Sequence, residues 1–233
     1  MTPPHSDGTS TDALSERRLR MVERQLRRRG IRNERVLRAM SQVPRELFVA
    51  PELRGQAYRD GALRIGEDQT ISQPWIVASM TSLLELTGDE RVLEVGTGSG
   101  YGAAVLSRCC REVVTIERYA SLASRAAEVL RELGYYNVEV RVGDGSKGAP
   151  DRAPFGGISV TATAREEPPA ALMRQLAPEG LLVCPVRRGD DERLMRFHAD
   201  GSWEPVVPVR FVPLVPQDED RGDRRSDPDA AAE

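Results

Sequence analysis

A short apolar run that leads directly into alternating glycines is the feature that most constrains the fold. Residues 91–95 (RVLEV) predict a buried strand, and GTGSGYG follows it without a spacer. Glycines at positions 96, 98 and 100 permit positive φ angles and the close approach of a ligand to the backbone. The spacing is GxGxG, whereas the dinucleotide fingerprint GxGxxG would need a glycine where Tyr101 stands. The stretch predicts the first strand–turn–helix unit of an α/β fold.

Strands and helices alternate after this unit. The expected strands are 91–95, 112–116, 138–142, 157–161 and 180–186. The expected helices between them are 101–108, 119–134 and 169–176. Crossovers of this length predict a mostly parallel, doubly wound sheet with helices on both faces. ERLMRFH and PVVPVRFVPLV, in the last third, predict further strands that run antiparallel at the sheet edge.

The N-terminal third is predicted to be helical. One helix is expected from Ser15 to Arg29, with Gly30 as its left-handed end. Its inner face would carry Leu19, Val22 and Leu26. Asn33 is expected to cap the next helix, and apolar residues at helical spacing predict another helix after Pro74.

Composition divides the chain into one domain and two tails. Residues 1–12 are rich in Pro, Ser, Thr and Asp, and residues 216–233 are almost entirely charged or helix-breaking, so both are predicted to be disordered. Residues 13–215 have the length of a single domain. Within it, 13–88 form the helical N-terminal part and 89–215 form the α/β core.

Charge and cysteine content argue against several function classes. A net charge of −3 does not favour a nucleic-acid partner. Cys109, Cys110 and Cys184 lack metal-ligand spacing, so no metal is expected and free thiols in a reducing cytoplasm fit best. The N-terminus has no apolar signal-peptide core, and no apolar run is long enough for a bilayer. We therefore expect a cytoplasmic protein without a membrane partner.

Acidic residues follow or end the predicted strands. Glu117 ends the second strand, 21 residues after Gly96, where doubly wound folds place an acid on ribose hydroxyls. Its alternative role is a strand-end carboxylate that pairs with Arg118 or faces solvent. Glu94 is a candidate to bind a ligand's amino group or to brace the glycine loop. Because ligands bind outside the carboxyl ends of such strands, both acids are candidates for one site.

A third strand end carries the turn VGDGSKG. Asp144 there could accept a hydrogen bond from an adenine amino group while the backbone of Gly145 approaches the ring. The GDG sequence alone is a common turn signal. Its position after a third strand is what makes it a candidate for the same site.

The stretch EDQTISQPW places two hydroxyls, Thr70 and Ser72, just before Pro74. The chain has two histidines, His5 and His198, and neither is a neighbour in sequence. Position alone favours Ser72 as a helix cap.

Several stretches from about Met21 to Val215 resemble the protein-L-isoaspartate (D-aspartate) O-methyltransferases. In order they are MVERQLRRRGI, VLRAMSQVPRELFV, AYRDGALRIGEDQTISQPWIVASM, RVLEVGTGSGYGAAVLS, VVTIER, LGYYNVEVRVGDGSKG, APF, LMRQLAPEG and VRFVPLV. The glycine loop alone suggests some S-adenosylmethionine enzyme, whereas QTISQP together with VPRELFV is specific to this family. The resemblance implies a Rossmann-like, S-adenosylmethionine-dependent methyltransferase fold with an N-terminal helical extension.

The resemblance also implies an activity. The cofactor S-adenosylmethionine would supply a methyl group to the free carboxylate of L-isoaspartyl and D-aspartyl residues in damaged peptides and proteins, which starts repair through a succinimide. The implied partners are isoaspartyl-containing peptides and proteins. We expect the chain itself to be a monomer.

Individual roles carry over from the resemblance by position. Ser72 matches the active-site serine, Thr70 is a second catalytic candidate, and Ile71 with Ser72 faces the substrate. The residues expected to bind the cofactor are Glu94, Gly96, Thr97, Gly98, Ser99, Glu117, Arg118, Asp144 and Gly145.

The sequence departs from the family pattern at three places. Glu67 and Asp68 stand where an apolar or aromatic residue and a glycine are usual, and an inward-facing acid there would repel a carboxylate substrate. Gly156 stands where Asp is common. Glu192 or Arg193 replaces a Gln that helps close the site.

These departures leave alternative functions open. The first is a methyltransferase that acts on a normal aspartate of a dedicated peptide. The second is a non-catalytic S-adenosylmethionine-binding adaptor. An RNA methyltransferase is less favoured, because the chain is acidic and lacks an aromatic-flanked motif such as NPPY.

Overall fold

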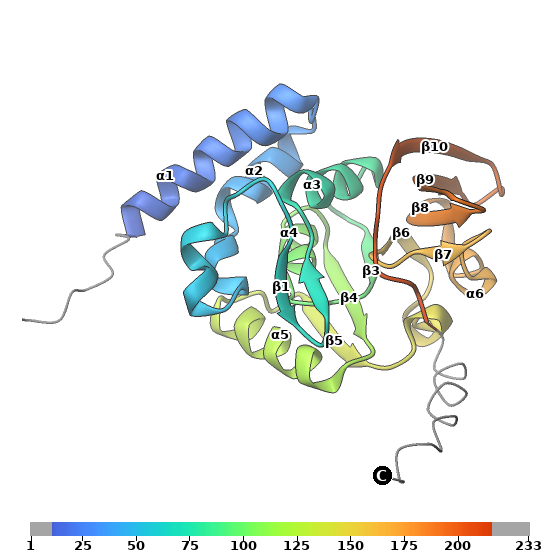
Figure 1. The fold of residues 1–233 in the computed structure, drawn as a ribbon. Helices are drawn as coiled ribbons and strands as arrows, with labels where there is room; N and C mark the ends of the chain where they lie inside the picture. The colour runs from blue at the N-terminus through green and yellow to red at the C-terminus, as the bar shows by residue number, and fades with distance from the viewer. Residues whose placement is uncertain (1–10, 216–233) are drawn as a thin grey trace, which may run out of the picture.

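The computed structural model describes residues 11–215 (Figure 1). Residues 1–10 and 216–233, which hold nearly all of the two expected tails, lie outside the described residues. Helix α1 (Thr11–Met21) begins inside the expected N-terminal tail, so Thr11 and Asp12 are helical and that boundary was wrong. An acidic residue in the first turn, here Asp12, favours helix formation through the helix dipole.

A mostly parallel sheet of eight strands forms the centre of the described chain. Its order is β10-β9-β8-β6-β3-β4-β5, and β7 pairs with β8. The parallel strands are β3 (Arg91–Val95), β4 (Glu112–Glu117), β5 (Val138–Val142), β6 (Phe155–Val160), β7 (Ala164–Arg165) and β8 (Leu176–Arg188). Strands β9 (Asp191–His198) and β10 (Trp203–Pro208) run antiparallel at one edge. This arrangement confirms the predicted Rossmann-like sheet and its antiparallel edge.

The order of the strands creates a crevice beside β3. The chain adds β4 and β5 on one side of β3 and then crosses to β6 on the other side. In open α/β sheets, ligands bind at such a switch point, outside the carboxyl ends of the strands. The carboxyl end of β3 is Val95, directly before the glycine loop.

Alternate strand residues build two cores, one on each face of the sheet. Val92 and Val113 belong to the core shared with helices α4 (Tyr101–Ser107) and α5 (Ala120–Glu132). Leu93 and Val114, their neighbours along the strands, belong to the second core. That second face is covered by the short helix α6 (Ala170–Met173) and by the 3-10 turns Gly145–Lys147 and Pro150–Arg152 around it. Buried on both faces, the strands read as apolar runs rather than as an alternating pattern.

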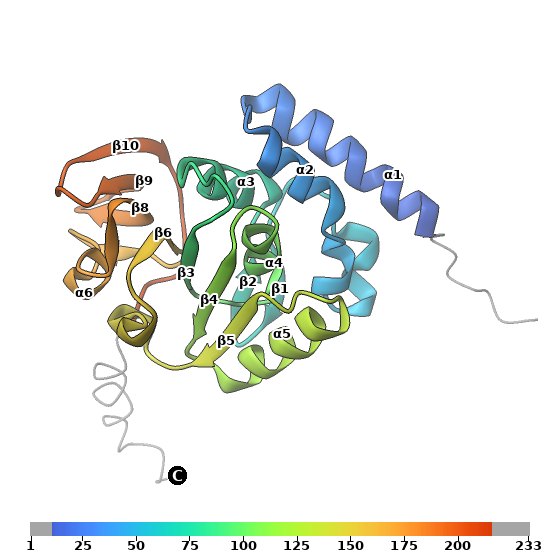
Figure 2. The same ribbon diagram turned by 180° about the vertical axis from the view of Figure 1, so that it is seen from behind.

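Helix α1 and the helical elements that directly follow it gather at one side of the molecule, opposite β8–β10 (Figures 1 and 2). After α1, a π-helical turn (Val22–Leu26) and a 3-10 turn (Arg27–Arg29) lead to Gly30, whose φ of 96° ends the helix as expected. Asn33 caps α2 (Glu34–Gln42) by accepting hydrogen bonds from the backbone N–H groups of Arg35 and Val36. Helix α3 (Pro74–Leu83) starts at the predicted proline.

The expected position of Leu19 was wrong. Its side chain is 57% exposed, whereas Met21, Val22 and Leu26 are buried. The π-helical turn adds a residue to one helical turn and so shifts the buried stripe along the chain.

A β-hairpin between α2 and α3 was not predicted. Strands β1 (Leu63–Gly66) and β2 (Gln69–Ile71) pair antiparallel, after the 3-10 turns Arg45–Phe48 and Pro51–Gln56. Glu67 and Asp68 form its two-residue turn with φ angles of 49° and 54°. Such turns usually carry Asn-Gly or Asp-Gly, so Glu-Asp gave no hairpin signal.

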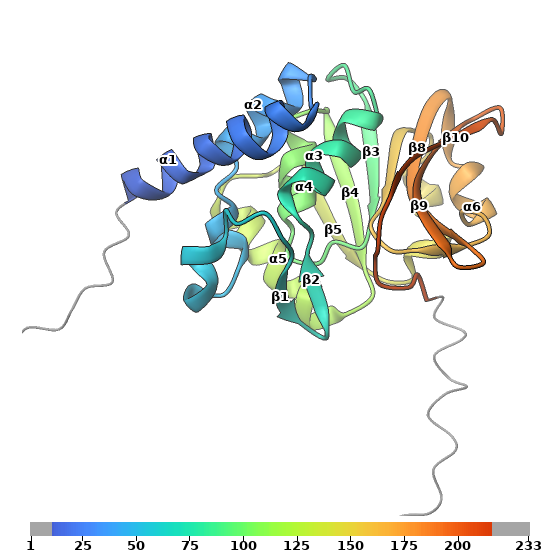
Figure 3. The ribbon, with the colours of Figure 1, turned by 45° about the horizontal axis from the view of Figure 1, so that its top comes forward.

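The C-terminal third also differs in length from the prediction. Helix α6 ends at Met173 rather than 176, and β8 begins at Leu176 and runs for 13 residues. Strand β10 stops at Pro208. The following residues, 209–215, here called the C-terminal segment, run back beside β3 (Figures 1 and 3), and Pro213 forms an isolated bridge with Thr163.

No helix among residues 11–215 is long and apolar enough to cross a membrane. The three cysteines are free and buried, in agreement with the expectation of free thiols.

Candidate active site

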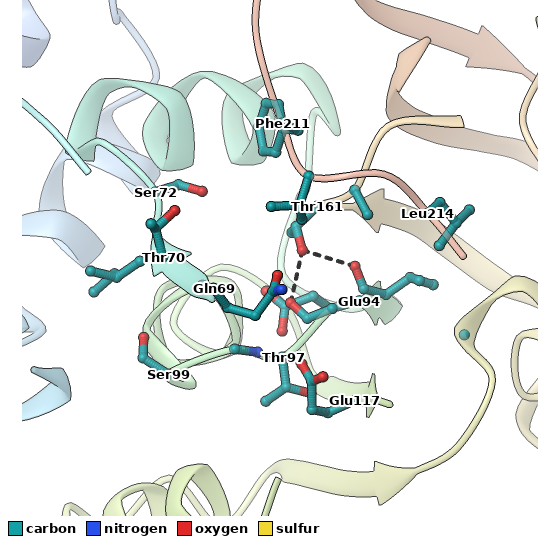
Figure 4. Close-up of a pocket in the computed structure, with 18 of the residues that line it drawn as sticks. Gln69, Thr70, Ser72, Glu94, Thr97, Ser99, Glu117, Thr161, Phe211 and Leu214 are labelled. Atoms are coloured by element: carbon teal, nitrogen blue, oxygen red, sulfur yellow. Dashed lines mark hydrogen bonds between the residues drawn. The ribbon is translucent and has the colours of Figure 1, made fainter. Parts of the chain in front are cut away.

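One pocket of about 1180 Å³ opens at the carboxyl ends of β3, β4, β5 and β6. Its lining includes every residue proposed from the sequence for the cofactor and the substrate. These residues are Thr70, Ile71, Ser72, Glu94, Gly96, Thr97, Gly98, Ser99, Glu117, Arg118, Asp144 and Gly145. Figure 4 shows Thr70 and Ser72 on one side of the pocket and the glycine loop with Glu117 on another. Neither His198 nor a cysteine lines it.

The glycine loop bends tightly between β3 and α4. Gly96, Gly98 and Gly100 have φ angles of 93°, 53° and 86°, a region that side chains with a Cβ rarely adopt. A Cβ on Gly96 would also collide with the hydroxyl of Thr161. That hydroxyl donates to the carbonyl oxygens of Val95 and Gly96, at 3.0 and 2.8 Å, and so fixes the start of the loop (Figure 4).

Glu94 lies beneath the loop and is 2% exposed. Thr115, opposite it on β4, donates a hydrogen bond of 2.6 Å to its carboxylate, and Thr97 lies 2.7 Å from the hydroxyl of Thr115. Burial raises the pKa of Glu94 to about 8, although the bond from Thr115 opposes the shift. The contacts fit the role of bracing the loop, one of the two roles considered for this acid.

Glu117 also lies at the pocket, at the end of β4. One carboxylate oxygen accepts from the N–H of Gly98 at 2.8 Å, and the other accepts from the N–H of Tyr119 at 3.0 Å. A carboxylate has about four acceptor sites, so each oxygen keeps capacity for a ligand hydroxyl. The guanidinium of neighbouring Arg118 lies over the ring of Tyr119.

Asp144 follows β5 and shapes a tight turn. Its carboxylate accepts hydrogen bonds from the N–H and the hydroxyl of Ser146, at 3.0 and 2.6 Å. A Cβ on Gly145 would collide with the side chain of Val95, so glycine lets this turn approach the sheet. Both Asp144 and Gly145 line the pocket.

The TIS stretch reaches the pocket from the hairpin. Ile71 is buried at the end of β2, Thr70 is exposed, and Ser72 is half-buried with its hydroxyl directed into the pocket (Figure 4). The cap residue of α3 is Gln73, and Ser72 makes no capping hydrogen bond. Helix capping therefore does not account for this serine.

Sequence reasoning missed several lining residues. Gln69 extends from β2 toward the centre of the pocket, and Phe211 and Leu214 enter from the C-terminal segment (Figure 4). Gln73 donates a 2.6 Å hydrogen bond to Asp60, which also pairs with Arg29. Gln69 and Gln73 lie within QTISQP, and Phe211 and Leu214 lie within VRFVPLV, but the sequence does not show that these distant stretches meet in one pocket.

Glu67 and Asp68, the two departures from the family pattern at the hairpin tip, lie in different surroundings. Glu67 accepts a hydrogen bond of 2.6 Å from Ser121 near the start of α5 and does not line the pocket. Asp68 is exposed and does line the pocket. The structure therefore leaves one of these acids, Asp68, near the substrate side.

The other departures lie outside the pocket. Gly156 is near the amino end of β6, opposite the site, where a Cβ would collide with Glu90, so it does not alter the substrate contacts. Glu192 accepts from the hydroxyl of Thr163 and the N–H of Phe211, both at 2.7 Å, and from Arg187 at 2.6 Å. Burial would raise the pKa of Glu192, but these hydrogen bonds outweigh it and lower the pKa. Glu192, one of the two residues expected to stand in place of the Gln, thus holds the C-terminal segment in place.

Within residues 11–215, no group of three or more His, Cys, Asp or Glu side chains could hold a metal ion. The pocket instead combines a glycine cradle, strand-end carboxylates and neutral hydroxyls. These groups suit a ligand with an ammonium group, ribose hydroxyls and an adenine ring.

Fold and pocket together define a Rossmann-like, S-adenosylmethionine-dependent methyltransferase. A profile of the protein-L-isoaspartate(D-aspartate) O-methyltransferase (PCMT) family matches residues 16–219. The chain belongs to this family.

Individual relatives agree with this assignment. A protein-L-isoaspartate O-methyltransferase of Trichlorobacter lovleyi is 50% identical over 204 residues, which cover 86% of this chain and 94% of the relative. A solved protein-L-isoaspartate O-methyltransferase superposes with a TM-score of 0.74 at 27% identity, covering 85% of this chain and 65% of that chain. A Plasmodium falciparum protein designated PCMT, in complex with S-adenosyl-L-homocysteine, has the same fold, with a TM-score of 0.74 at 24% identity and coverage of 85% and 98%.

Proposed function

We propose that this enzyme transfers a methyl group from S-adenosylmethionine to the free carboxylate of L-isoaspartyl and D-aspartyl residues in damaged peptides and proteins. The observation that carries the proposal is one pocket with the glycine loop on one side and Thr70, Ile71 and Ser72 on another. Family membership over nearly the whole described chain supports it.

The residues around the pocket suit a nucleophile that is already ionised. A carboxylate has lost its proton near pH 7, so its attack on a sulfonium methyl group requires no general base. Among residues 11–215, no histidine lines the pocket, which is compatible with this chemistry. Positioning in well-oriented reactions can supply about 7–11 kcal/mol of the barrier.

Uncharged hydrogen-bond donors are suited to binding the substrate carboxylate that accepts the methyl group. Negative charge disappears from the carboxylate as the methyl group is transferred, so a tight ion pair would stabilise the ground state more than the transition state. The hydroxyl of Ser72 would orient the carboxylate, with Thr70 as a second donor and Ile71 against the peptide. Gln69, which sequence reasoning missed, offers a further neutral donor on the same side.

The cofactor would lie against the glycine loop. S-adenosylmethionine, when bound, supplies the electrophilic methyl group. Gly96, Thr97, Gly98 and Ser99 would face its methionine part, with Glu94 bracing the loop. Glu117 would accept the ribose hydroxyls beside Arg118, and Asp144 with Gly145 would meet the adenine.

The product explains why methylation leads to repair. The methyl ester is a better leaving group than the free carboxylate, so the neighbouring backbone nitrogen closes a succinimide ring without further help. Hydrolysis of that ring returns part of the material as normal aspartate. The enzyme therefore needs only to transfer the methyl group and release the peptide.

We further propose that residues 13–215 act as one monomeric methyltransferase domain in the cytoplasm, with no nucleic-acid partner. The net charge of −3 supports the expectation of no nucleic-acid partner, and one pocket lined by both parts of the domain supports a single functional unit.

A methyl-transfer assay with labelled cofactor tests the function. Two peptides of identical sequence are compared, one with isoaspartate and one with normal aspartate. We expect base-labile methyl ester from the isoaspartyl peptide alone. Preference for the aspartyl peptide would indicate a methyltransferase that acts on a normal aspartate of a dedicated peptide. This second candidate function is favoured by Asp68, an acid that lines the pocket. Cofactor binding without ester from either peptide would indicate an adaptor.

A further inference from the structure

Arg45 lies completely buried behind the TISQP turn, with 0% of its surface exposed. Its Nε donates a 2.7 Å hydrogen bond to the carbonyl oxygen of Ala57, and one terminal nitrogen donates a 2.8 Å hydrogen bond to the carbonyl oxygen of Ser72. The guanidinium carbon also lies 4.8 Å from the centre of the Tyr101 ring. A single side chain thus contacts three separate segments of the chain.

A buried cation is an expensive way to stabilise a fold. Removing a guanidinium from water carries a penalty that well-packed apolar residues avoid. Burial lowers the pKa of Arg45 to about 10, which still leaves it charged at neutral pH. Its other terminal nitrogen, Nη1, has no hydrogen-bond partner among the described residues. Only the ring of Tyr101 offers it a compensating cation–π contact.

The three contacts join the two halves of the pocket. Ser72 belongs to the substrate side, and Tyr101 is the first residue of α4, directly after the glycine loop on the cofactor side. Ala57 follows the 3-10 turn that leads into the hairpin. The distance between Ser72 and the glycine loop therefore depends on one rigid, planar group, the guanidinium of Arg45.

We propose that Arg45 is a positioning residue that holds Ser72, through its carbonyl oxygen, at a fixed distance from the glycine loop. This inference rests on the proposed function of Ser72. Displacing reacting groups by about 1 Å can reduce turnover about 10²-fold, so a group that sets this distance affects turnover without touching the substrate.

Arg45→Lys and Arg45→Met separate positioning from folding. Lysine keeps the charge, but its single ammonium cannot reproduce the planar two-point contact, and methionine keeps only the length. Each variant is measured for kcat and KM with an isoaspartyl peptide, for the Kd of S-adenosylhomocysteine, and for Tm. Turnover is divided by the fraction of protein that binds S-adenosylhomocysteine, so that unfolded material does not count.

A double-mutant cycle with Ser72→Ala provides the decisive measurement. If Arg45 acts through Ser72, Arg45→Lys should lower kcat about 10- to 100-fold in the wild-type background. In the Ser72→Ala background the same change should lower kcat less than about 3-fold, since the positioned hydroxyl is already gone. The Kd of S-adenosylhomocysteine should change less than about 3-fold throughout.

Arg91→Lys is the matched control. Arg91 is hydrogen-bonded to Glu112 and to the carbonyl oxygen of Arg152 at the amino end of the sheet, away from the pocket. Its kcat should stay within about 2-fold of wild type, as for changes outside a site.

Equal losses of kcat from Arg45→Lys in both backgrounds would overturn the inference, as would loss of S-adenosylhomocysteine binding in parallel with kcat. A wild-type enzyme without ester formation would overturn the proposed function itself, and the role of Arg45 with it.

Discussion

Glu94 and Thr115 face each other across adjacent strands, and the threonine hydroxyl donates a 2.6 Å hydrogen bond to the buried carboxylate. Thr97, in the glycine loop, lies 2.7 Å from the same hydroxyl. The conformation of the loop is therefore coupled to a carboxyl group with a pKa near 8.

This coupling predicts a pH dependence of stability. The pKa of Glu94 is about 8 in the folded protein and 4.5 as an ordinary carboxyl. Between these values the folded protein holds a proton that the unfolded chain has released. The stability contributed by this group is thus complete below the lower value and is lost as pH rises through the higher one. Glu94→Gln should remove this loss, so thermal denaturation should show the Tm of wild type falling relative to the variant between about pH 4.5 and 8 and levelling off above the higher value.

Glu128→Gln, a change of an exposed glutamate on α5, is the control for that measurement. Its Tm should follow wild type across the pH range. Parallel curves for wild type and Glu94→Gln would contradict the prediction.

Ser72→Ala should lower kcat for an isoaspartyl peptide about 10²-fold, the usual cost of one preorganised donor. The Kd of S-adenosylhomocysteine, measured by calorimetry, should change little, since the serine belongs to the hairpin side of the pocket. Ser82→Ala, near the far end of the adjoining helix α3, serves as the control. Equal weakening of cofactor binding and turnover would indicate a structural role for Ser72.

Glu117→Gln should weaken cofactor binding about 10-fold, because hydrogen bonds to a charged group contribute about 1.5–3 kcal/mol and the amide retains part of them. At saturating S-adenosylmethionine, kcat should stay close to wild type. Titration with S-adenosylhomocysteine separates the two quantities. An unchanged Kd would show that this carboxylate serves only the N–H groups of Gly98 and Tyr119.

Glu192→Ala should release the C-terminal segment, because it removes the acceptor for both Thr163 and the N–H of Phe211. We expect faster tryptic cleavage after the exposed Arg210 and a kcat/KM lower by about 10-fold, as for the loss of hydrogen bonds to a charged acceptor. Mass spectrometry of a timed digest locates the cleavage. Glu204→Ala on β10 removes one of the two carboxylate partners of Arg196, the other being Glu85, and should leave the cleavage rate unchanged.

Asp68→Asn should improve KM for isoaspartyl peptides that carry a second acid next to the isoaspartate, because like charges repel near the pocket. The gain should shrink as salt is added, since exposed charges are screened. Glu67→Asn is the neighbouring control, as Glu67 is directed to Ser121. A salt-independent gain would point to a cause other than charge.

The local chemistry of the chain made the cofactor half predictable. Buried runs such as RVLEV have one plausible structure, and glycines 96, 98 and 100 adopt the positive φ angles that their pattern indicated. Caps such as Asn33 depend on contacts within a few residues, and this one was correct.

The substrate half was less predictable, because its walls form between distant segments. The turn at Glu67 and Asp68 lacks the usual residues, so the hairpin gave no local signal. Phe211 reaches the pocket only because Glu192 and Thr163 bind the segment that carries it. The error at Leu19 arose from a π-helical turn, which periodicity alone does not reveal.

The position of the C-terminal segment has a consequence for biosynthesis. During translation, the glycine loop and its acidic neighbours leave the ribosome long before residues 209–215 do. A nascent chain that has not reached residue 209 would hold the glycine loop, Glu94 and Glu117 while lacking one wall of the cleft. Residues 209–215 must therefore be made before the pocket is complete.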